Sequence, residues 1–187
     1  MILEIPSLTI DEGKIYGLVG KNGAGKTTLF RLLSGLTFPT QGYIRYKEEN
    51  IKKGVIIEYP SIEYQMNAVE NLEWAKKLYG IEECQDITNL LKLVNLEKYK
   101  YEKVKKYSLG MKQRLGIAMC LLCNPQLLIL YEPMNGLDPE GIVEFRNLLK
   151  DINRQGTTIL ISSHILDELY KLVKPLLGNI ETVKKYV

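Results

Sequence analysis

Hydrophobic residues along this chain follow two patterns: short, mostly unbroken runs, and longer stretches in which they recur every three or four positions. Short runs are typical of strands covered on both faces, whereas the longer spacing is typical of helices. The runs predict four buried strands: 15–19, 55–57, 127–130 and 157–162. The helical spacing predicts helices at 28–33, 109–123, 139–154 and from residue 165 onward. Strands that alternate with crossover helices predict an α/β fold with a mostly parallel sheet, and a ligand at the carboxyl ends of the strands.

Weaker patterns add further short strands and a helical lobe to this outline. Segment 3–10 alternates weakly and predicts a short strand pair, and segment 43–46 follows a turn that contains Pro and Gly and predicts one more strand. From residue 69 to about 107 the apolar spacing is helical, which predicts an inserted lobe. With the helix that follows, this helical subdomain spans about 69–124. We expect residues 1–187 to form a single domain, because this length supports one substantial core.

Composition places the chain among ordinary globular domains and argues against several functions. Of its 187 residues, 45% are hydrophobic and 25% are charged, and the formal net charge is +3. Because this charge is mild and mixed in sign, we expect no nucleic-acid partner. The longest apolar run is well short of the ~18 residues read as a membrane span, and no basic-then-apolar leader opens the sequence. We therefore expect a cytosolic chain.

The three cysteines favour core packing over chemistry. Cys84, Cys120 and Cys123 are too few for a paired disulfide framework. Cys120 and Cys123 have the C-x-x-C spacing of redox and zinc sites, but they lie within an apolar helical pattern and have no second Cys or His pair nearby. Buried free cysteines are common, so we interpret them as core residues.

The segment 20–28 carries the most specific chemical pattern in the chain. It fits G-x-x-x-x-G-K-[ST], the glycine loop that binds nucleoside triphosphates, between a predicted strand and a predicted helix. Backbone N–H groups and the helix start would face phosphate oxygens, Lys26 would add a charge, and the Thr27 hydroxyl can ligate Mg²⁺. A chance glycine turn is the alternative. The predicted nucleotide-binding residues are Gly20, Lys21, Asn22, Gly23, Ala24, Gly25, Lys26, Thr27 and Thr28.

Polar residues outside this loop are further candidates. Ser108 begins a predicted helix and, with Gly110, offers N–H groups and a hydroxyl to an anion such as a γ-phosphate, although a plain helix N-cap is the alternative. Glu132 directly follows a buried strand and could orient or deprotonate an attacking water. His164 follows the next strand and could bind the γ-phosphate or that water, the alternative being a satisfied polar residue at a strand end.

Four segments that follow the glycine loop in order resemble motifs of the nucleotide-binding subunit of an ABC transporter. Residues 107–113 look like the family signature in its S-x-G-x-K-Q form, and 127–133 line up with the Walker B strand. Residues 135–139 look like the D-loop, and 162–164 look like the switch histidine. The resemblance covers roughly residues 5–170 and is closest to the ATPases of bacitracin and lantibiotic export or self-resistance.

The resemblance implies the cofactors and the roles of several residues. It implies ATP and Mg²⁺, with Glu132 and His164 as catalytic residues. In this subgroup the Q-loop is often acidic, and Glu58 with its neighbours is similar to it, which places Glu58 beside Thr27 as a candidate on the metal side.

The resemblance also implies the partners. Two copies of the chain would sandwich two ATP molecules head to tail, so that the helix start at Ser108 and Gly110 faces the nucleotide of the second subunit. Separate ABC permease subunits in the membrane would complete the transporter. The chain would then be peripheral on the inner face of the cell membrane.

The chain departs from the family pattern at one position that bears on function. Where the Walker B strand normally ends in Asp, this chain has Tyr131, a bulkier phenol that stays neutral at pH 7, so the local negative charge is lost. Its hydroxyl could still accept a hydrogen bond from Thr27 or from a magnesium-bound water. Alternatively, Glu132 could take the metal role, which would leave the hydrolytic water without its base. Both ends of the chain also look short, so we expect an abbreviated, decayed or partial copy. Two alternatives to an ATP-hydrolysing export subunit therefore stay open: a degenerate nucleotide-binding subunit that does not hydrolyse ATP, and a soluble ABC ATPase that acts on ribosomes or DNA.

Overall fold

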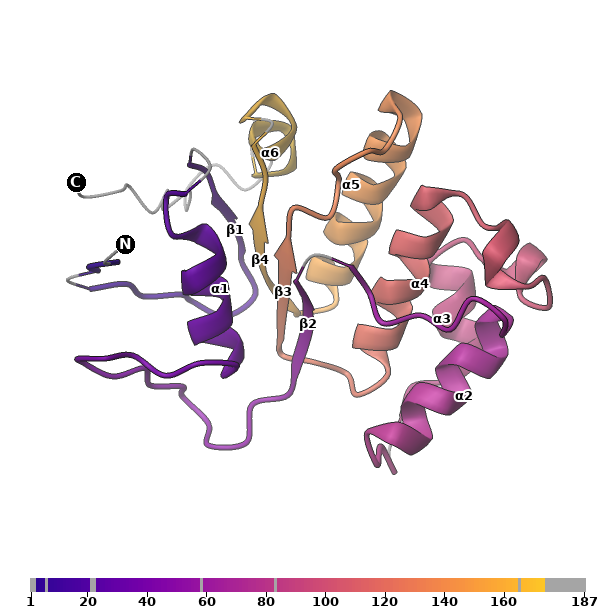
Figure 1. The fold of residues 1–187 in the computed structure, drawn as a ribbon, viewed down its shortest axis with the longest axis horizontal. Helices are drawn as coiled ribbons and strands as arrows, with labels where there is room; N and C mark the ends of the chain where they lie inside the picture. The colour runs from indigo at the N-terminus through magenta and orange to yellow at the C-terminus, as the bar shows by residue number, and fades with distance from the viewer. Residues whose placement is uncertain are drawn as a thin grey trace.

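A parallel sheet covered by helices on both faces forms the centre of the chain (Figure 1). The computed structural model describes residues 3–5, 7–20, 23–57, 59–82, 84–164 and 166–173. Its strands are β1 (Ile15–Leu18), β2 (Lys53–Ile57), β3 (Leu127–Tyr131) and β4 (Thr158–Ser162). Its helices are α1 (Lys26–Ser34), α2 (Ala68–Leu78), α3 (Ile87–Leu93), α4 (Leu109–Leu121), α5 (Pro139–Arg154) and α6 (Leu166–Val173).

The carboxyl ends of the four strands lie in register at one end of the sheet, which we call the carboxyl edge. Their order is β1-β4-β3-β2, and every neighbouring pair is parallel. Leu18 lies opposite Ser162, Ser162 opposite Tyr131, and Tyr131 opposite Ile57. The prediction of an α/β fold with a mostly parallel sheet is confirmed, and segments that leave the carboxyl ends of these strands start from a common edge.

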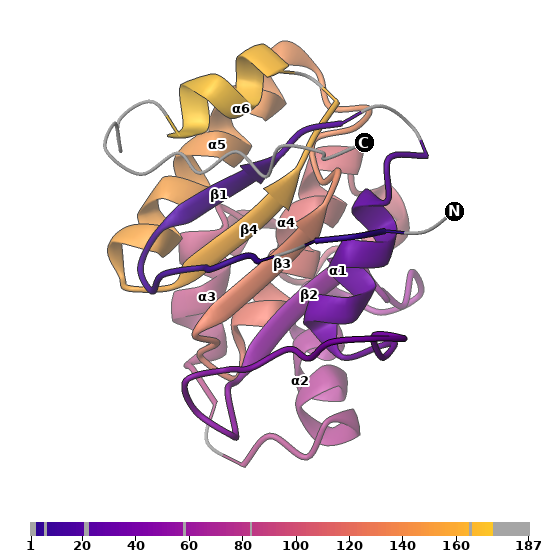
Figure 2. The ribbon, with the colours of Figure 1, turned by 90° about the vertical axis from the view of Figure 1, so that its left-hand side faces the viewer.

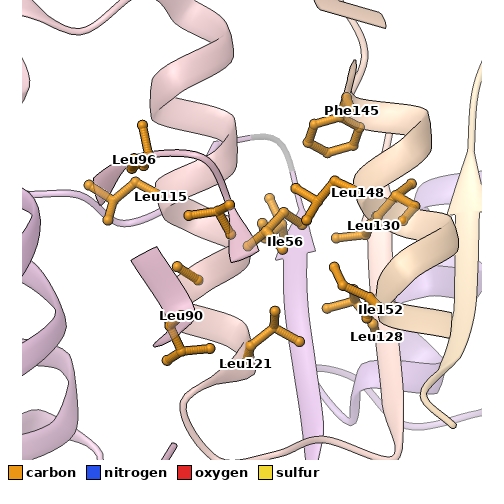
Figure 3. Packing of buried hydrophobic residues seen from close by; sticks show 14 of the residues in the cluster. Ile56, Leu90, Leu96, Leu115, Leu121, Leu128, Leu130, Phe145, Leu148 and Ile152 are labelled. Carbon is orange, nitrogen blue, oxygen red and sulfur yellow. The ribbon is translucent and has the colours of Figure 1, made fainter. Parts of the chain in front are cut away.

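The sheet separates two apolar layers. Leu128 and Leu130 of β3 pack with residues of α4 and α5, including Leu115, Phe145 and Leu148 (Figure 3). The alternate residue Ile129 points the other way, into a smaller cluster with α1. Both layers are buried because successive side chains of a strand point to opposite faces of the sheet.

Helix α4 packs on the same face of the sheet as α5, and α2 and α3 pack on α4 (Figure 1). Two 3₁₀ turns, Glu97–Tyr99 and Val104–Lys106, connect α3 to α4. Helix α2 begins with a capping box, in which the Asn67 side chain accepts from the Glu70 N–H at 2.9 Å and Glu70 accepts from the Asn67 N–H at 2.7 Å. Every helix in the described ranges is too short or too polar to cross a membrane. The division into a single domain with a helical subdomain at 69–124 stays a prediction.

Two glycines bring α4 close to the sheet. A Cβ on Gly116 would overlap the Pro60 ring, lying 2.9 Å from Pro60 Cγ, and a Cβ on Gly54 of β2 would lie 2.7 Å from Cys120 Cβ. Any larger residue at either position needs the helix or the strand to move, because such distances are shorter than van der Waals contact.

The two weaker strand predictions are wrong. Described residues of segment 3–10, and all of 43–46, form no strand. Leu3, Ile5 and Leu8 are half-buried against the α1 layer, so the alternation did indicate which side chains face the core. A strand also needs a neighbour to pair with its N–H and C=O groups, and alternation alone does not supply one.

The cysteines are free thiols at the end of the α4 region and in the segment before α3. Burial raises the pKa of the Cys120 thiol to about 12, and burial likewise raises the pKa of Cys123. Thiolates are the reactive and metal-binding form, so these two groups stay protonated and unreactive at neutral pH. This supports the interpretation as packing residues.

Replacing Gly116 by Ala tests the close packing of α4. Ala favours helices over Gly, yet the Pro60 clash should dominate and lower the free energy of unfolding by about 1–3 kcal/mol. The matched control is Gly110→Ala in the same helix, where the nearest side chain, Leu137, would be 3.6 Å from the new Cβ. Urea titrations of both variants give the comparison, and equal stabilities would contradict the inferred clash.

Candidate functional site

The candidate site lies at the edge of the sheet where the parallel strands end. The chain leaving β1 forms the glycine loop and enters α1, which starts at this edge (Figure 2). Glu132 directly follows β3, and Ser163 and His164 directly follow β4. Ligands of open α/β sheets bind at such an edge, so the topology assembles these residues where a ligand is expected.

The described part of the glycine loop has the backbone that the pattern requires. Gly23 and Gly25 have φ values of 79° and 87°, a left-handed conformation in which a side chain would be strained. Gly25 is the N-cap residue of α1 and has no side chain to bond the first N–H groups of the helix. These groups therefore suit an anion such as phosphate. The predicted residues Lys21 and Asn22 lie outside the described residues.

Lys26 is the buried cation of the site. Only 4% of its side chain is exposed, and its Nζ donates a hydrogen bond to the Gly20 carbonyl. The same Nζ lies 3.4 Å from Oε1 of Glu132. The first residue of α1 is thus joined to both the start of the loop and the end of β3.

Glu132 is fixed in place by its backbone and by one carboxylate oxygen. Its φ of 48° is left-handed, and its N–H donates to Ser162 Oγ at 3.0 Å. Oε2 accepts from Asn135 Nδ2 at 2.6 Å and lies 3.4 Å from Nδ1 of His164. Oε1 is buried and accepts no hydrogen bond from the described residues. The two oxygens therefore have different surroundings.

The charge state of Glu132 follows from competing effects. Burial by itself would raise its pKa, but the hydrogen bond from Asn135, the charge of Lys26 and the contact with His164 together outweigh burial. The pKa of Glu132 is therefore lower than that of an ordinary glutamate, and the side chain is an anion at neutral pH.

Tyr131 lies on the face of the sheet that packs on α1. Its side chain packs in the α1 layer, with its ring edge-on to the Phe30 ring at a centroid distance of 5.8 Å and an interplanar angle of 82°. Edge-to-face contacts of this kind are favourable for aromatic pairs. The position at which the resemblance implies a carboxylate is thus used for apolar packing.

Ser108 and Gly110 belong to the start of α4. The Ser108 hydroxyl accepts from the Met111 N–H at 3.2 Å and caps α4, which agrees with the plain N-cap alternative without excluding an anion-binding role. A Cβ on Gly110 would meet Leu137, so the start of α4 lies beside the turn that follows Asn135. Thr27 is half-buried and Thr28 exposed in the first turn of α1. Glu58 lies outside the described residues.

Asn135 and Ser162 are polar partners of Glu132 that the sequence did not single out. Asn135 was noted only within the D-loop resemblance, although its place three residues after Glu132 suits a contact across a turn. Ser162 has no sequence signal of its own, because its role depends on β4 lying beside β3.

Comparisons with known proteins agree with this geometry. The sequence pattern of the ABC transporter family matches residues 3–135. The bacitracin transport ATP-binding protein BcrA of Enterococcus faecalis is 46% identical over 177 residues, which are 89% of this chain and 57% of that protein. The lantibiotic transport ATP-binding protein SrtF of Streptococcus pyogenes is 43% identical over 91% of this chain and 77% of that protein.

A solved structure shows the same fold. The structure of cbiO1 from Clostridium perfringens, described as part of the ABC transporter complex cbiONQ, superposes with a TM-score of 0.81 at 27% identity. The match covers 91% of this chain and 75% of that one. This chain spans about 57% of the length of BcrA, so it corresponds to part of that relative.

Replacing Asn135 by Ala tests the hydrogen bond to Glu132. Removing the donor should raise the pKa of Glu132, which NMR titration of its side-chain carboxyl carbon can measure. Ionised Glu132 stabilises the fold above its unfolded-state pKa, and this contribution is lost as pH falls through the lower folded-state pKa. The free energy of unfolding of the variant should therefore depend less on pH in this range. The exposed Asn89→Ala in α3 is the control, and equal Glu132 pKa values in both variants would contradict the contact.

Proposed function

This chain belongs to the ABC transporter family, and we propose from this premise that it is an ATP-binding subunit of an exporter. One observation carries the proposal. The glycine loop places Lys26, buried, 3.4 Å from the anionic Glu132 at the carboxyl edge of a parallel sheet. A buried cation beside uncapped helix N–H groups suits the β- and γ-phosphates of ATP.

The class of exported substrate is inferred from relatives. BcrA and SrtF are named for bacitracin transport and lantibiotic transport, and both are more than 40% identical to this chain. We therefore propose export of, or self-resistance to, a peptide antibiotic. Substrate specificity would lie in membrane subunits.

The proposed partners are ABC permease subunits and a second nucleotide-binding subunit. Large apolar and aromatic side chains, which are enriched at protein interfaces, are exposed in and just before the helical region. They are Tyr59, Tyr64, Trp74, Leu78, Tyr79, Tyr99 and Tyr101. Docking of this region on a permease would place the chain at the inner face of the membrane. A head-to-tail second copy would bring its Ser108 and Gly110 to the nucleotide.

The proposed reaction is hydrolysis of ATP. The oxygen of a water forms a bond to the γ-phosphorus while the bond to the β–γ bridging oxygen breaks, and the proton of the water passes to a base. Glu132 is an anion that can orient the water or accept this proton, and the exposed His164 can bind the γ-phosphate. Lys26 and the loop N–H groups would bind the phosphate oxygens.

The residues present fit Mg²⁺ bound together with ATP. Thr27 offers a hydroxyl in the first turn of α1, and Glu132 Oε1 is a buried oxygen that accepts no hydrogen bond from the described residues. Hard oxygen donors of this kind suit the ion. Mg²⁺, when bound, neutralises charge on the transferring phosphoryl group.

A second candidate function is a subunit that binds nucleotide without hydrolysing it. The observation that favours it is Tyr131, whose ring lies in the apolar layer beside Phe30 instead of supplying a carboxylate. ATP binding through Lys26 does not depend on that position, whereas hydrolysis does.

Lys26→Ala tests the nucleotide site itself. Loss of a charge-assisted contact worth about 1.5–3 kcal/mol should weaken ATP binding by about 10–150-fold. Titration with a fluorescent ATP analogue measures the change. Lys47→Ala, which removes an exposed lysine paired with Glu12, is the matched control and should bind normally. Equal affinities for the two variants would contradict the proposed site.

Tyr131→Asp distinguishes the two candidate functions. A restored carboxylate should raise phosphate release by about 10–100-fold, or about 1.4–2.7 kcal/mol of transition-state stabilisation. Tyr131→Phe, which keeps the ring packing, should give no gain. Rapid turnover by the unmodified chain, abolished in Glu132→Gln, would show that Tyr131 does not limit hydrolysis.

A further inference from the structure

The two carboxylate oxygens of Glu132 have different partners. Oε2 is held by Asn135 at 2.6 Å and lies beside His164. Oε1 is buried and forms an ion pair with Lys26 Nζ at 3.4 Å, but it accepts no hydrogen bond from the described residues. The ion pair offsets part of the cost of burying this oxygen, while its capacity to accept hydrogen bonds or bind a cation is left for a ligand.

The position of Oε1 points to the phosphate side of the site. Lys26 is the first residue of α1 and Thr27 is the second, so Oε1 lies beside the helix start that would bind the β- and γ-phosphates. The oxygen that faces His164 is Oε2, which also accepts from Asn135. The left-handed backbone at Glu132 and the bond from its N–H to Ser162 fix this orientation.

Tyr131 supplies no competing carboxylate at this edge. Its ring is committed to the Phe30 contact in the α1 layer. In the described part of the chain, no group of three or more His, Cys, Asp or Glu side chains could hold a metal ion. A cation here would therefore depend on nucleotide phosphates for most of its oxygens, as is common for Mg²⁺.

We propose that Glu132, through Oε1, is the carboxylate that binds the nucleotide-borne Mg²⁺ in this chain, in the role that Tyr131 cannot fill. This inference rests on the proposed function. Glu132 would then bind the cation instead of acting on the water of the proposed reaction, so this inference favours the second candidate function, binding of Mg²⁺ and ATP without turnover.

The test is the effect of Mg²⁺ on nucleotide affinity, which requires no turnover. A fluorescent ATP analogue is titrated in Mg²⁺ and in EDTA. The affinity in Mg²⁺ divided by the affinity in EDTA, the Mg²⁺ ratio, is compared between variants. Glu132→Gln should lower this ratio by about 10-fold or more, the range seen when a residue that organises a metal site is removed. Adding Tyr131→Asp to Glu132→Gln should restore the ratio.

Two controls separate this effect from general damage. Glu12→Gln removes an exposed carboxylate at the opposite edge of the sheet and should leave the ratio unchanged. Tyr131→Phe removes only the phenol and should also leave it unchanged. Thermal melts of each variant in EDTA establish that the fold is intact.

The outcomes separate this inference from the proposed function. An unchanged Mg²⁺ ratio in Glu132→Gln, with ATP still bound, would overturn the inference and leave the proposed function standing. A lower Mg²⁺ ratio in Tyr131→Phe would overturn it as well, because the Tyr131 hydroxyl would then be the group that binds the cation. Absence of ATP binding by the unmodified chain would overturn both.

Discussion

The site depends on one buried pair of opposite charges that joins two parts of the fold. Lys26 comes from the helix that covers one face of the sheet, and Glu132 comes from the end of a central strand. Neither charge could be buried alone without a large desolvation penalty. The Gly20 carbonyl and the Asn135 amide complete the partners of the pair, so the loop, the helix start and the strand end are fixed relative to one another.

The alternation of β3 explains how a residue change at this edge is accommodated. Tyr131 belongs to the face that packs on α1, and Phe30 gives its ring an apolar neighbour. Glu132 follows the strand with a left-handed backbone, so its side chain does not follow the alternation of the strand. A change in polarity at Tyr131 can therefore alter the chemistry of the edge without disturbing the position of Glu132.

Much of the architecture was predictable because local patterns and topology agree. The four buried strands and the helix at 139–154 were predicted from apolar spacing, and parallel order then required their carboxyl ends to meet. The segments 3–10 and 43–46 failed because alternation describes one buried face and says nothing of a pairing neighbour. Lys26 and Glu132 were each predicted from motifs. The different surroundings of the two Glu132 oxygens, the Asn135 contact and the packing of the Tyr131 ring were not, since each depends on side-chain directions that only packing decides.

The order of the strands has a consequence for how the chain acquires its structure during synthesis. Strand β1, which leads into the glycine loop, lies at the edge of the described sheet beside β4, and Ile15 pairs with Ile159. Nearly all of the described chain must therefore leave the ribosome before β1 finds its neighbour. Contacts so distant in sequence form slowly. Until then the apolar residues of β1 are unpaired, so β1 is protected from aggregation only after β4 has been synthesised.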